Sequence, residues 1–376
     1  MSKLNGYSGH VFGDPPNEHY PWGMQDLNRP HPPVVQPGVK PGGPPSDAMV
    51  LFDGTEDSFR NWKHTTFKLK RKGDWKVEDG VLLSTPGAGF LATVEEFGDC
   101  QLHLEWAPPL ERKGSGQGRG NSGVFLMGEI EVQILDNYQN PTYADGTAGA
   151  VYGEMPPEVN ALKGPDAWQS YDIIFRRPIV KGGKVLDVGS MTVLVNGVVV
   201  QDSVPLNGGG GYRQRKQPQD SLRLPDKGPL CLQDHGNPVR FRNIWIRPLR
   251  ARPVDGGLDG RLEPDVVFAK RAEIAKTLRQ QAKVLSGRER AFKLMDSLLY
   301  ETEESVWKEA EKLALAYIVE CSGLSRQQLD KRRESIIELY RMVKHLRKYE
   351  RVTQASEIDD QLKKLTEDQG WNVKFQ

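Results

Sequence analysis

The 376-residue sequence has no long apolar run, almost no net charge and few cysteines. No stretch of about 18 or more apolar residues occurs, so no segment is predicted to span a membrane. A formal charge of +1 gives no reason to expect nucleic acid or an anionic membrane as a partner. The three isolated cysteines, Cys100, Cys231 and Cys321, argue against a disulfide framework and lack C-x-x-C spacing, so we expect small buried side chains.

Three regions of different composition follow one another along the chain. The chain is long enough for more than one folded unit, because single cores rarely exceed about 250 residues. We expect an extended arm at 1–47, a β domain at 48–249, a linker at 250–264 and a helical extension at 265–376. The arm is rich in proline, glycine and asparagine and has too little apolar surface to fold alone. Its candidate anchors on a folded domain are Tyr20, Pro21 and Trp22.

The β domain is predicted to be an antiparallel β-sandwich. The run Trp75–Ser84 predicts a hairpin, because Asp79-Gly80 separates two β-prone segments, and Asn196-Gly197 divides a second such run. Several other segments alternate polar and apolar residues with period two: CQLHLEWAP, GVFLM, EIEVQIL and YDIIFRR. Many short strands without intervening amphipathic helices are typical of a sandwich.

The last part of the chain predicts helices. Helical spacing is present at Val267–Leu285, Arg288–Tyr300, Glu303–Cys321 and Ser325–Tyr349. Pro264 suits a first helical turn, Ser325 with Gln328 predicts a capping box, and Gly287 and Gly323 are expected to be C-caps. Such helices could pack on the sandwich, self-associate or pair between subunits as a homodimer, and the sequence leaves this open.

The segment from Asn121 to Asp136 places acidic side chains along one strand. Alternation puts Glu129, Glu131 and Gln133 on one face and apolar residues on the other. In a jelly roll the polar face is commonly the concave, sugar-binding surface. Two adjacent carboxylates repel, so we expect one to have a raised pKa suited to acid–base work. A solvated outer strand face is the alternative.

A second polar group is predicted near a Gly-Asn-Pro turn. Asp234 and His235 end a strand there, and Arg240 and Arg242 point to one side of the next strand. Histidine is the natural base near neutral pH. A purely structural hydrogen-bonding role for His235 is an equal alternative.

These segments, taken in order, resemble the 3-keto-disaccharide hydrolase domain family. The matching motifs are LFDG…W at Leu51–Trp62, NSGVFL, EVQILD, GAVYG at Gly149–Gly153, W-x-x-YDI at Trp168–Ile173 and LQDHG-x-PVRFRNIWIRPL. The likeness covers about 200 residues and excludes the arm and the helices. It implies a concanavalin-like jelly-roll β-sandwich, followed here by a C-terminal α-helical region.

The resemblance also implies a reaction, the cleavage of glycosides already oxidised to a ketone at C3 of the sugar. The C3 carbonyl acidifies the C2 hydrogen, so a base can form an enolate that expels the C1 substituent, by elimination or with later addition of water. We expect Glu131 and His235 to share the acid and base roles, with Glu129 as a further catalytic candidate.

Other side chains are candidates for holding the substrate. Asp234 or Gln133 would orient the acid and base, Arg242, Asn121 or Tyr152 would bind hydroxyls or the oxyanion, and Trp168 would stack on a sugar face. A divalent cation held by Glu, Asp and His side chains would suit the enolate, although no metal-spaced cluster such as H-x-H demands one. The expected partner is therefore a small carbohydrate.

Two other function classes stay open at this point. A lectin-like carbohydrate-binding module would not need Glu131 and His235 to converge. An ordinary glycoside hydrolase would need a second carboxylate about 5–5.5 or 6.5–9.5 Å from the first, for which Glu105 and Glu154 are candidates. The first residues lack the apolar core of a secretory signal, so an export signal is either absent or already removed. Relatives are commonly exported, which favours a periplasmic or extracellular setting.

Overall fold

The computed structural model describes residues 13–65, 73–164, 166–250, 252, 263–352 and 356–373. The chain divides into two compact units, one formed by Pro33–Ala251 and one by Met1–Pro32 with Arg252–Gln376. Most of the expected linker at 250–264 lies outside the described residues. Across the described part of the chain, no helix combines the length and the apolar character needed to cross a bilayer.

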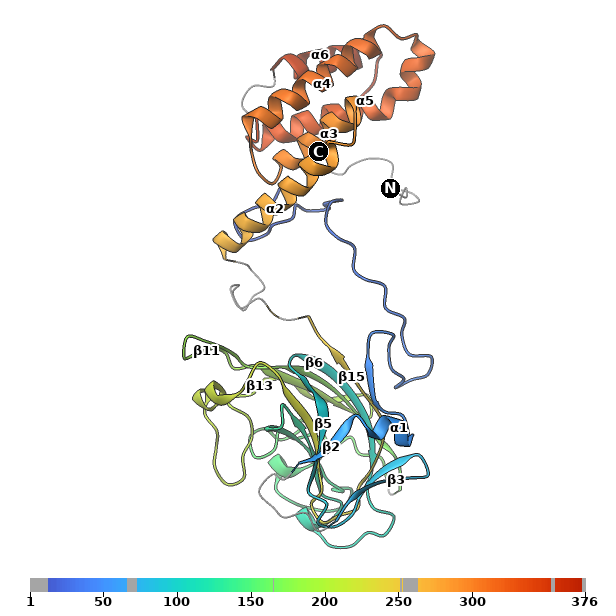
Figure 1. Cartoon of the computed structure of the whole chain (residues 1–376), viewed down its shortest axis with the longest axis vertical. Helices are drawn as coiled ribbons and strands as arrows, with labels where there is room; N and C mark the ends of the chain where they lie inside the picture. Colours follow the sequence, from blue (N-terminus) through green and yellow to red (C-terminus); the bar gives the residue numbers. More distant parts are fainter. Residues whose placement is uncertain are drawn as a thin grey trace. The chain divides into compact units, whose positions relative to one another are not determined.

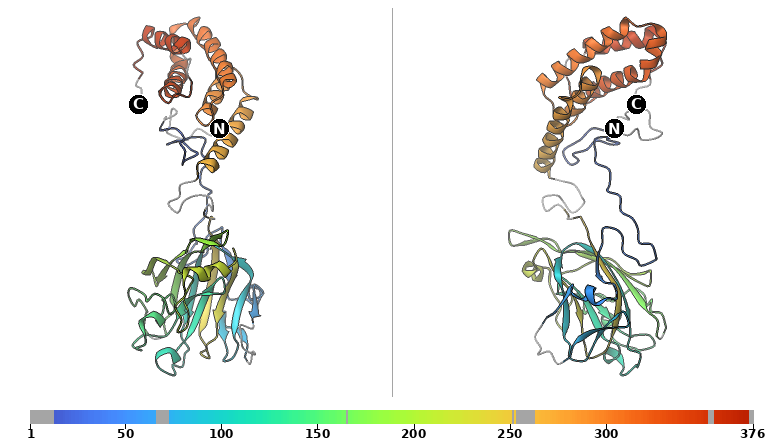
Figure 2. Two further views of the ribbon diagram at one scale, coloured as in Figure 1. Left: turned by 90° about the vertical axis from the view of Figure 1, so that its left-hand side faces the viewer. Right: turned by 45° about the vertical axis from the view of Figure 1, so that its right-hand side comes forward.

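The unit Pro33–Ala251 is an antiparallel jelly-roll β-sandwich, drawn at the bottom of Figure 1 and from two further directions in Figure 2. Its larger sheet has eight strands in the order β13-β12-β9-β6-β15-β4-β3, with β1 also paired to β15. Their bounds are β1 Met49–Phe52, β3 Trp75–Glu78, β4 Val81–Ser84, β6 Cys100–Ala107, β9 Gln169–Arg176, β12 Ser190–Val195, β13 Val198–Pro205 and β15 Arg240–Pro248.

The second sheet has five strands in the order β2-β5-β14-β7-β8. Their bounds are β2 Trp62–Thr65, β5 Phe90–Phe97, β7 Ser122–Leu126, β8 Ile130–Ile134 and β14 Gly228–Gln233. Outside the two sheets lie the hairpin β10 Ile179–Lys181 with β11 Lys184–Asp187, the short helix α1 Glu56–Phe59, and the 3-10 turns η1 Gly116–Gly118, η2 Ala144–Gly146 and η3 Pro218–Arg223.

The core lies between the two sheets and is built from alternate strand positions. Leu102 and Leu104 of β6 point into it from the larger sheet, and Val124 of β7 and Val132 of β8 point into it from the smaller one, all fully buried. Successive side chains of a strand point to opposite faces. The neighbouring positions on both sheets therefore face away from the core, and this fixes where the candidate site residues point.

The two predicted Asx-Gly hairpins are confirmed. Asp79 and Gly80 have φ values of 50° and 74° between β3 and β4, and Asn196 and Gly197 have 53° and 81° between β12 and β13. Positive φ at both central residues is the signature of the type I′ turn, whose twist matches that of the flanking strands.

The second unit contains the helices α2 Pro264–Ala282, α3 Gly287–Leu298, α4 Glu304–Ser322, α5 Arg326–Lys348 and α6 Ser356–Asp368. The capping box is confirmed, because the Gln328 side chain accepts a hydrogen bond from the Ser325 N–H at 3.0 Å. Gly323 is the C-cap of α4, as expected. The expectation for Gly287 was wrong, since this residue begins α3 instead of ending α2. Trp22 of the arm packs edge-on against Tyr300 of this unit.

Candidate active site

Glu131 lies on the outer face of the five-stranded sheet. In β8 its neighbours Ile130 and Val132 are buried in the core, so the Glu131 side chain points the other way. It pairs in register with Phe125 of β7, which in turn pairs with Cys231 of β14. These three residues form one row across the outer face, as the alternation predicts.

A glycine leaves room for the Glu131 side chain beside this row. Gly123, two residues from Phe125 in β7, faces the same side of the sheet. A Cβ atom on Gly123 would lie 2.2 Å from Oε1 of Glu131 and 2.9 Å from the Phe125 ring. The Glu131 carboxyl group therefore lies over the bare backbone of Gly123, a position that a side chain at residue 123 would fill.

Burial raises the pKa of Glu131 from 4.5 to about 8. The sequence predicted a raised pKa, but it attributed the shift to repulsion from Glu129. In the structure Glu129 lies before the start of β8, is exposed and pairs with Arg223 at 3.4 Å. Desolvation of Glu131, and not charge repulsion, is the cause. At neutral pH Glu131 is therefore mainly protonated and can donate a proton.

Two tyrosine hydroxyls accompany Glu131. The hydroxyl oxygens of Tyr143 and Tyr152 are 2.8 Å apart, and the Tyr152 N–H donates to the Glu131 carbonyl oxygen at 3.1 Å. Burial, the hydrogen bond with Tyr143 and negative charge on Glu131 all raise the pKa of Tyr152. Tyr152 consequently stays a phenol throughout the physiological range and serves as a hydrogen-bond donor.

His235 lies on the neighbouring strand path. In the pairing of β14 with β7, Cys231 lies opposite Phe125 and Leu232 opposite Val124, so the next residue, Gln233, lies opposite Gly123. Ser122 Oγ donates a hydrogen bond to the Gln233 carbonyl at 2.6 Å. The strand β14, which ends at Gln233, therefore lies next to the strand that carries Gly123. His235 lies two residues beyond the last residue of β14, Gln233, in the turn that leads to β15, and it is exposed.

A chain of side-chain amides continues from β8 into the adjoining loop. Gln133 donates to Oε1 of Gln117 at 3.0 Å and to the Gly146 carbonyl at 3.3 Å. Asn121 donates to the Gln117 carbonyl at 2.8 Å. The polar side chains of β8 were expected to face solvent along the whole strand. Gln133, however, is only 1 % exposed. Gln117 and Gly146 contact its side chain, and residues 149–152 pair with the edge of β8 through backbone hydrogen bonds, such as that of Gln133 N–H with the Ala150 carbonyl at 3.0 Å.

Asp234 holds the turn next to His235. Its carboxylate accepts hydrogen bonds from the backbone N–H groups of Gly87 at 2.7 Å and Gly236 at 2.9 Å. No hydrogen bond joins it to the His235 ring among the described residues. Asp234 therefore fixes the strand end that carries His235, while its side chain is occupied by backbone donors.

The structure does not bring Arg242 and Trp168 to Glu131. In β15 the intervening Phe241 is fully buried, so Arg242 points outward from the eight-stranded sheet. There it lies 4.1 Å from the centre of the Trp168 ring and binds Glu105 at 2.6 Å. Stacked sheets are about 10 Å apart, so these residues are on the opposite outer face of the sandwich from Glu131. Sequence patterns could not show which sheet each strand joins.

Glu105 and Glu154, the candidates for a second carboxylate, differ in their surroundings. Desolvation opposes ionisation of Glu105, but hydrogen bonds from Asn243 and Arg242 outweigh it and lower its pKa. Burial raises the pKa of Glu154 to about 7, against a hydrogen bond from Asn207. Burial is the one cause of the raised pKa of Glu131, so the charges of Glu105 and Glu154 have no appreciable effect on that pKa.

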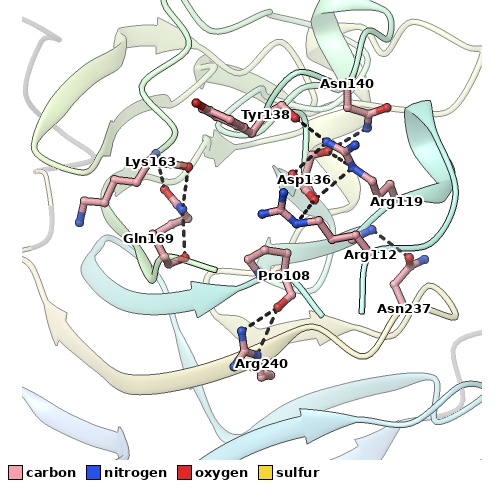
Figure 3. Close-up of polar contacts among 12 residues, drawn as sticks. Pro108, Arg112, Arg119, Asp136, Tyr138, Asn140, Lys163, Gln169, Asn237 and Arg240 are labelled. Carbon is pink, nitrogen blue, oxygen red and sulfur yellow. Dashed lines mark hydrogen bonds and ion pairs between the residues drawn. The ribbon is translucent and has the colours of Figure 1, made fainter. Parts of the chain in front are cut away.

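A buried ion-pair cluster supports the loop that follows β8. Asp136, 3 % exposed, lies between Arg112 and Arg119, with N–O distances of 3.4 and 3.1 Å (Figure 3). Arg119 also donates to the Tyr138 carbonyl, and Asn140 donates to the Asp136 carbonyl at 2.8 Å. The cluster fixes the path of the chain as it leaves the sheet beside Gln133. Among the described residues, no group of three or more His, Cys, Asp or Glu side chains is arranged to hold a metal ion.

Several residues of this site were not predicted. Gly123 had a usable signal, because a glycine inside a strand often marks a close approach. Gln117 and Tyr143 lie in irregular loops, where no periodicity indicates which way a side chain points. They join the site only through the tertiary path of residues 112–147, which includes η1 and η2.

Comparisons with known proteins agree with this architecture. A family model described as "3-keto-alpha-glucoside-1,2-lyase-like domain" matches residues 47–247. The chain is 23 % identical over 241 residues to a 3-keto-disaccharide hydrolase of Bacteroides thetaiotaomicron, covering 54 % of this chain and 78 % of that protein. A crystal structure from Parabacteroides distasonis, described as a "putative glycosyl hydrolase", is 40 % identical with a TM-score of 0.54, covering 60 % of this chain and 95 % of that one.

Proposed function

The chain belongs to the 3-keto-alpha-glucoside-1,2-lyase-like domain family, and on that premise we propose that it cleaves 3-keto-glycosides by removing the C2 proton and expelling the C1 substituent. Family membership makes it a carbohydrate-active, hydrolase-like protein. The observation that supports the finer proposal is the Glu131 carboxyl group over Gly123, where burial raises its pKa to about 8; His235 follows β14, which is separated from β8 by β7.

Glu131 and His235 suit opposite proton-transfer roles at neutral pH. Because the pKa of Glu131 is raised to about 8, its carboxyl group holds a proton to donate. A histidine imidazole is a natural proton acceptor in the same pH range. In this proposal the sugar ring binds against the outer face of the sheet between the two side chains, with each group reaching a different side of the C1–C2 bond.

The proposed step balances in protons and electrons. His235 takes the C2 proton, and the electron pair of the C2–H bond forms an enolate with the C3 carbonyl. The enolate re-forms the carbonyl as the C1–O bond breaks, and Glu131 gives its proton to the leaving oxygen. The products are a 2-hydroxy-3-keto-glycal and the free alcohol, and addition of water to the glycal completes a net hydrolysis.

The phenol of Tyr152 supplies a donor for the charge that develops. Its hydroxyl is held by Tyr143 at 2.8 Å, and its pKa is raised, so it keeps its proton while a negative charge forms nearby. A preorganised donor of this kind stabilises an oxyanion without reorganising during the reaction. We assign it to the enolate oxygen or to a neighbouring sugar hydroxyl.

An ordinary retaining glycosidase would need a second carboxylate about 5–5.5 Å from the first. A charge so close would add repulsion to the pKa shift of Glu131, whereas burial alone accounts for that shift. The polar face of Glu131, Gln133 and Gln233 offers amides where such an enzyme would place its nucleophile. Elimination therefore fits the chemistry of this face better than double displacement.

The position of the lost proton tests the mechanism. In D2O, turnover of a 3-keto-glucoside by elimination and water addition should place deuterium at C2 of the released sugar, in excess of exchange without protein. Direct hydrolysis leaves the C2 proton in place. Released sugar with no excess deuterium at C2 would overturn the proposed mechanism, and His235→Ala should abolish both release and excess deuteration.

A further inference from the structure

A cavity of about 430 Å³, open to solvent, lies in the same unit as Glu131. It is formed by the loop that follows β8 and by Asn160. A volume in this range is typical of sites for small molecules. The mechanism proposed above does not use it.

The lining of this cavity is polar and uncharged. It consists of four amide side chains, two threonines and Pro141, with no acidic, basic or aromatic residue among them. Such a lining offers hydrogen bonds but neither a counter-ion nor a large apolar wall. It therefore suits a neutral ligand rich in hydroxyl groups, and it does not suit an anion, a cation or a lipid chain.

Several amide groups of the lining are available to a ligand. Asn137 accepts from the Ala148 N–H at 2.9 Å and Asn160 from the Leu162 N–H at 3.2 Å, so both use their oxygen. Their NH₂ groups, and the whole side chain of the exposed Gln139, form no hydrogen bond with any residue that the structure describes. Gln139 also has a left-handed backbone with φ of 51°, a strained conformation that is common at functional sites.

The wall that carries these amides is held in place before any ligand arrives. The fourth amide, Asn140, is 6 % exposed and bonds both backbone groups of Gly116, at 2.6 and 3.0 Å. The buried Asp136 is fixed between Arg112 and Arg119 at the base of the same loop (Figure 3). A rigid polar wall lowers the entropy cost of binding.

The cavity adjoins the Glu131 site through its two threonines. Thr142 accepts a hydrogen bond from Gln117 at 3.1 Å, and Gln117 in turn accepts from Gln133 at 3.0 Å. Thr147 follows Gly146, whose carbonyl accepts from Gln133 at 3.3 Å. Consecutive Cα atoms are about 3.8 Å apart. One wall of the cavity is thus a single residue away from groups that contact Gln133, which lies on the same side of β8 as Glu131.

From this arrangement we propose that the cavity is a second sugar subsite, which holds the neutral sugar unit attached to the ring being cleaved. The inference rests on the proposed function for its position in the reaction, but the binding of a neutral sugar by the cavity can be measured separately. Pro141 offers a small apolar surface to the C–H groups of the ring, while the free amides of Asn137, Gln139 and Asn160 meet its hydroxyls.

The test is the double variant Gln139→Gly with Asn160→Ala. Glycine accepts the left-handed backbone of residue 139, so the fold is expected to survive. Gln281→Ala, which removes an exposed amide from α2, is the matched control. With a two-ring 3-keto-disaccharide we expect the double variant to raise KM about 10-fold to 30-fold, the loss of two hydrogen bonds. With methyl 3-keto-glucoside, which has one ring, KM should not change.

Titration of an unoxidised neutral disaccharide, followed by calorimetry or NMR, separates the two proposals. Weakened disaccharide binding in the double variant, with unchanged binding in Gln281→Ala, would support the subsite. This holds even if the protein turns over no 3-keto-glycoside, because absence of turnover would refute only the proposed function. The subsite is refuted if the disaccharide does not bind wild-type protein, or binds wild type and double variant equally. Equal KM changes for the one-ring and two-ring substrates would also refute it.

Discussion

The Glu131 carboxyl group and the backbone of Gly123 share one space, since a Cβ on residue 123 would lie 2.2 Å from Oε1 of Glu131. The contact joins two strands, β7 and β8, whose register places Gly123 opposite Gln133 and Phe125 opposite Glu131. The missing side chain allows the carboxyl group to lie low over the sheet, where burial raises its pKa to about 8. Position and protonation state of the proposed acid therefore depend on the same glycine.

Gly123→Ala should lower kcat about 10-fold or more, because a new methyl group displaces the Glu131 carboxyl group and misplaced catalytic groups cost at least that much. Steady-state kinetics with a 3-keto-glucoside would measure the loss. Gly118→Ala is the control, since a Cβ there would meet nothing within 4 Å. Equal activity in Gly123→Ala and wild type would remove Glu131 from the reaction.

Glu131→Gln should reduce kcat about 10²-fold to 10⁴-fold on substrates with a poor leaving group, because the amide cannot donate a proton to the glycosidic oxygen. A nitrophenolate leaves without protonation, so the defect should largely disappear with a nitrophenyl 3-keto-glucoside. Comparing the two substrates measures the acid role directly. A defect of the same size on both would argue that Glu131 has another role.

Activity should fall as the pH rises through about 8, the raised pKa of Glu131. Above this pH the carboxyl group loses the proton that it donates, so kcat/KM declines. A pH–rate profile between about pH 6 and 10 would show this limb. The residual activity of Glu131→Gln should lack it, and a profile that instead rises through pH 8 would indicate that Glu131 acts as the base.

Stability should respond to the same group. In the folded protein burial raises the pKa of Glu131 from 4.5 to about 8, so between these values the folded state binds more protons than the unfolded state. The free energy of unfolding contributed by this group is fully present below pH 4.5 and is lost as the pH rises through about 8. Urea titrations should show Glu131→Gln gaining on wild type by about 1–3 kcal/mol over this window, allowing for partial solvent exposure.

Arg242→Ala should leave kcat and KM unchanged, although its position in the PVRFRN motif made it a substrate-binding candidate. The side chain lies on the outer face of the eight-stranded sheet, paired with Glu105 at 2.6 Å and stacked on Trp168. Loss of a partly exposed ion pair and a cation–π contact should cost about 0.5–2 kcal/mol of stability. A rise in KM without loss of stability would contradict this placement.

The sequence alone predicted the secondary-structure elements and the part of the candidate site that lies on β8. Period-two alternation correctly put Glu131 and Gln133 on the same side of β8, and Asn196-Gly197 correctly marked a hairpin. These are local properties, which depend on backbone geometry within a few residues. The order of strands within each sheet is not local. That is why Arg242, close to His235 in sequence, lies on the opposite face of the sandwich from Glu131.

Burial was the other quantity that the sequence could not supply. The pKa of Glu131 was expected to rise through repulsion from Glu129, but burial of Glu131 raises it while Glu129 remains exposed. Desolvation depends on the tertiary surroundings of a residue, and the neighbour of Glu131 at the edge of β8, Tyr152, lies about 20 positions further along the chain. The role of Gln117 in joining Gln133 to the loop was hidden for the same reason.

The most direct test of the account is a comparison of purified protein on a 3-keto-glucoside and on its unoxidised parent glucoside, with and without EDTA. Elimination depends on the acidity that the C3 carbonyl gives to the C2 hydrogen, so we predict cleavage of the keto substrate and no cleavage of the parent. Loss of activity with EDTA would add a metal ion to the site. Cleavage of the parent glucoside at a comparable rate would contradict the central claim and indicate an ordinary glycosidase.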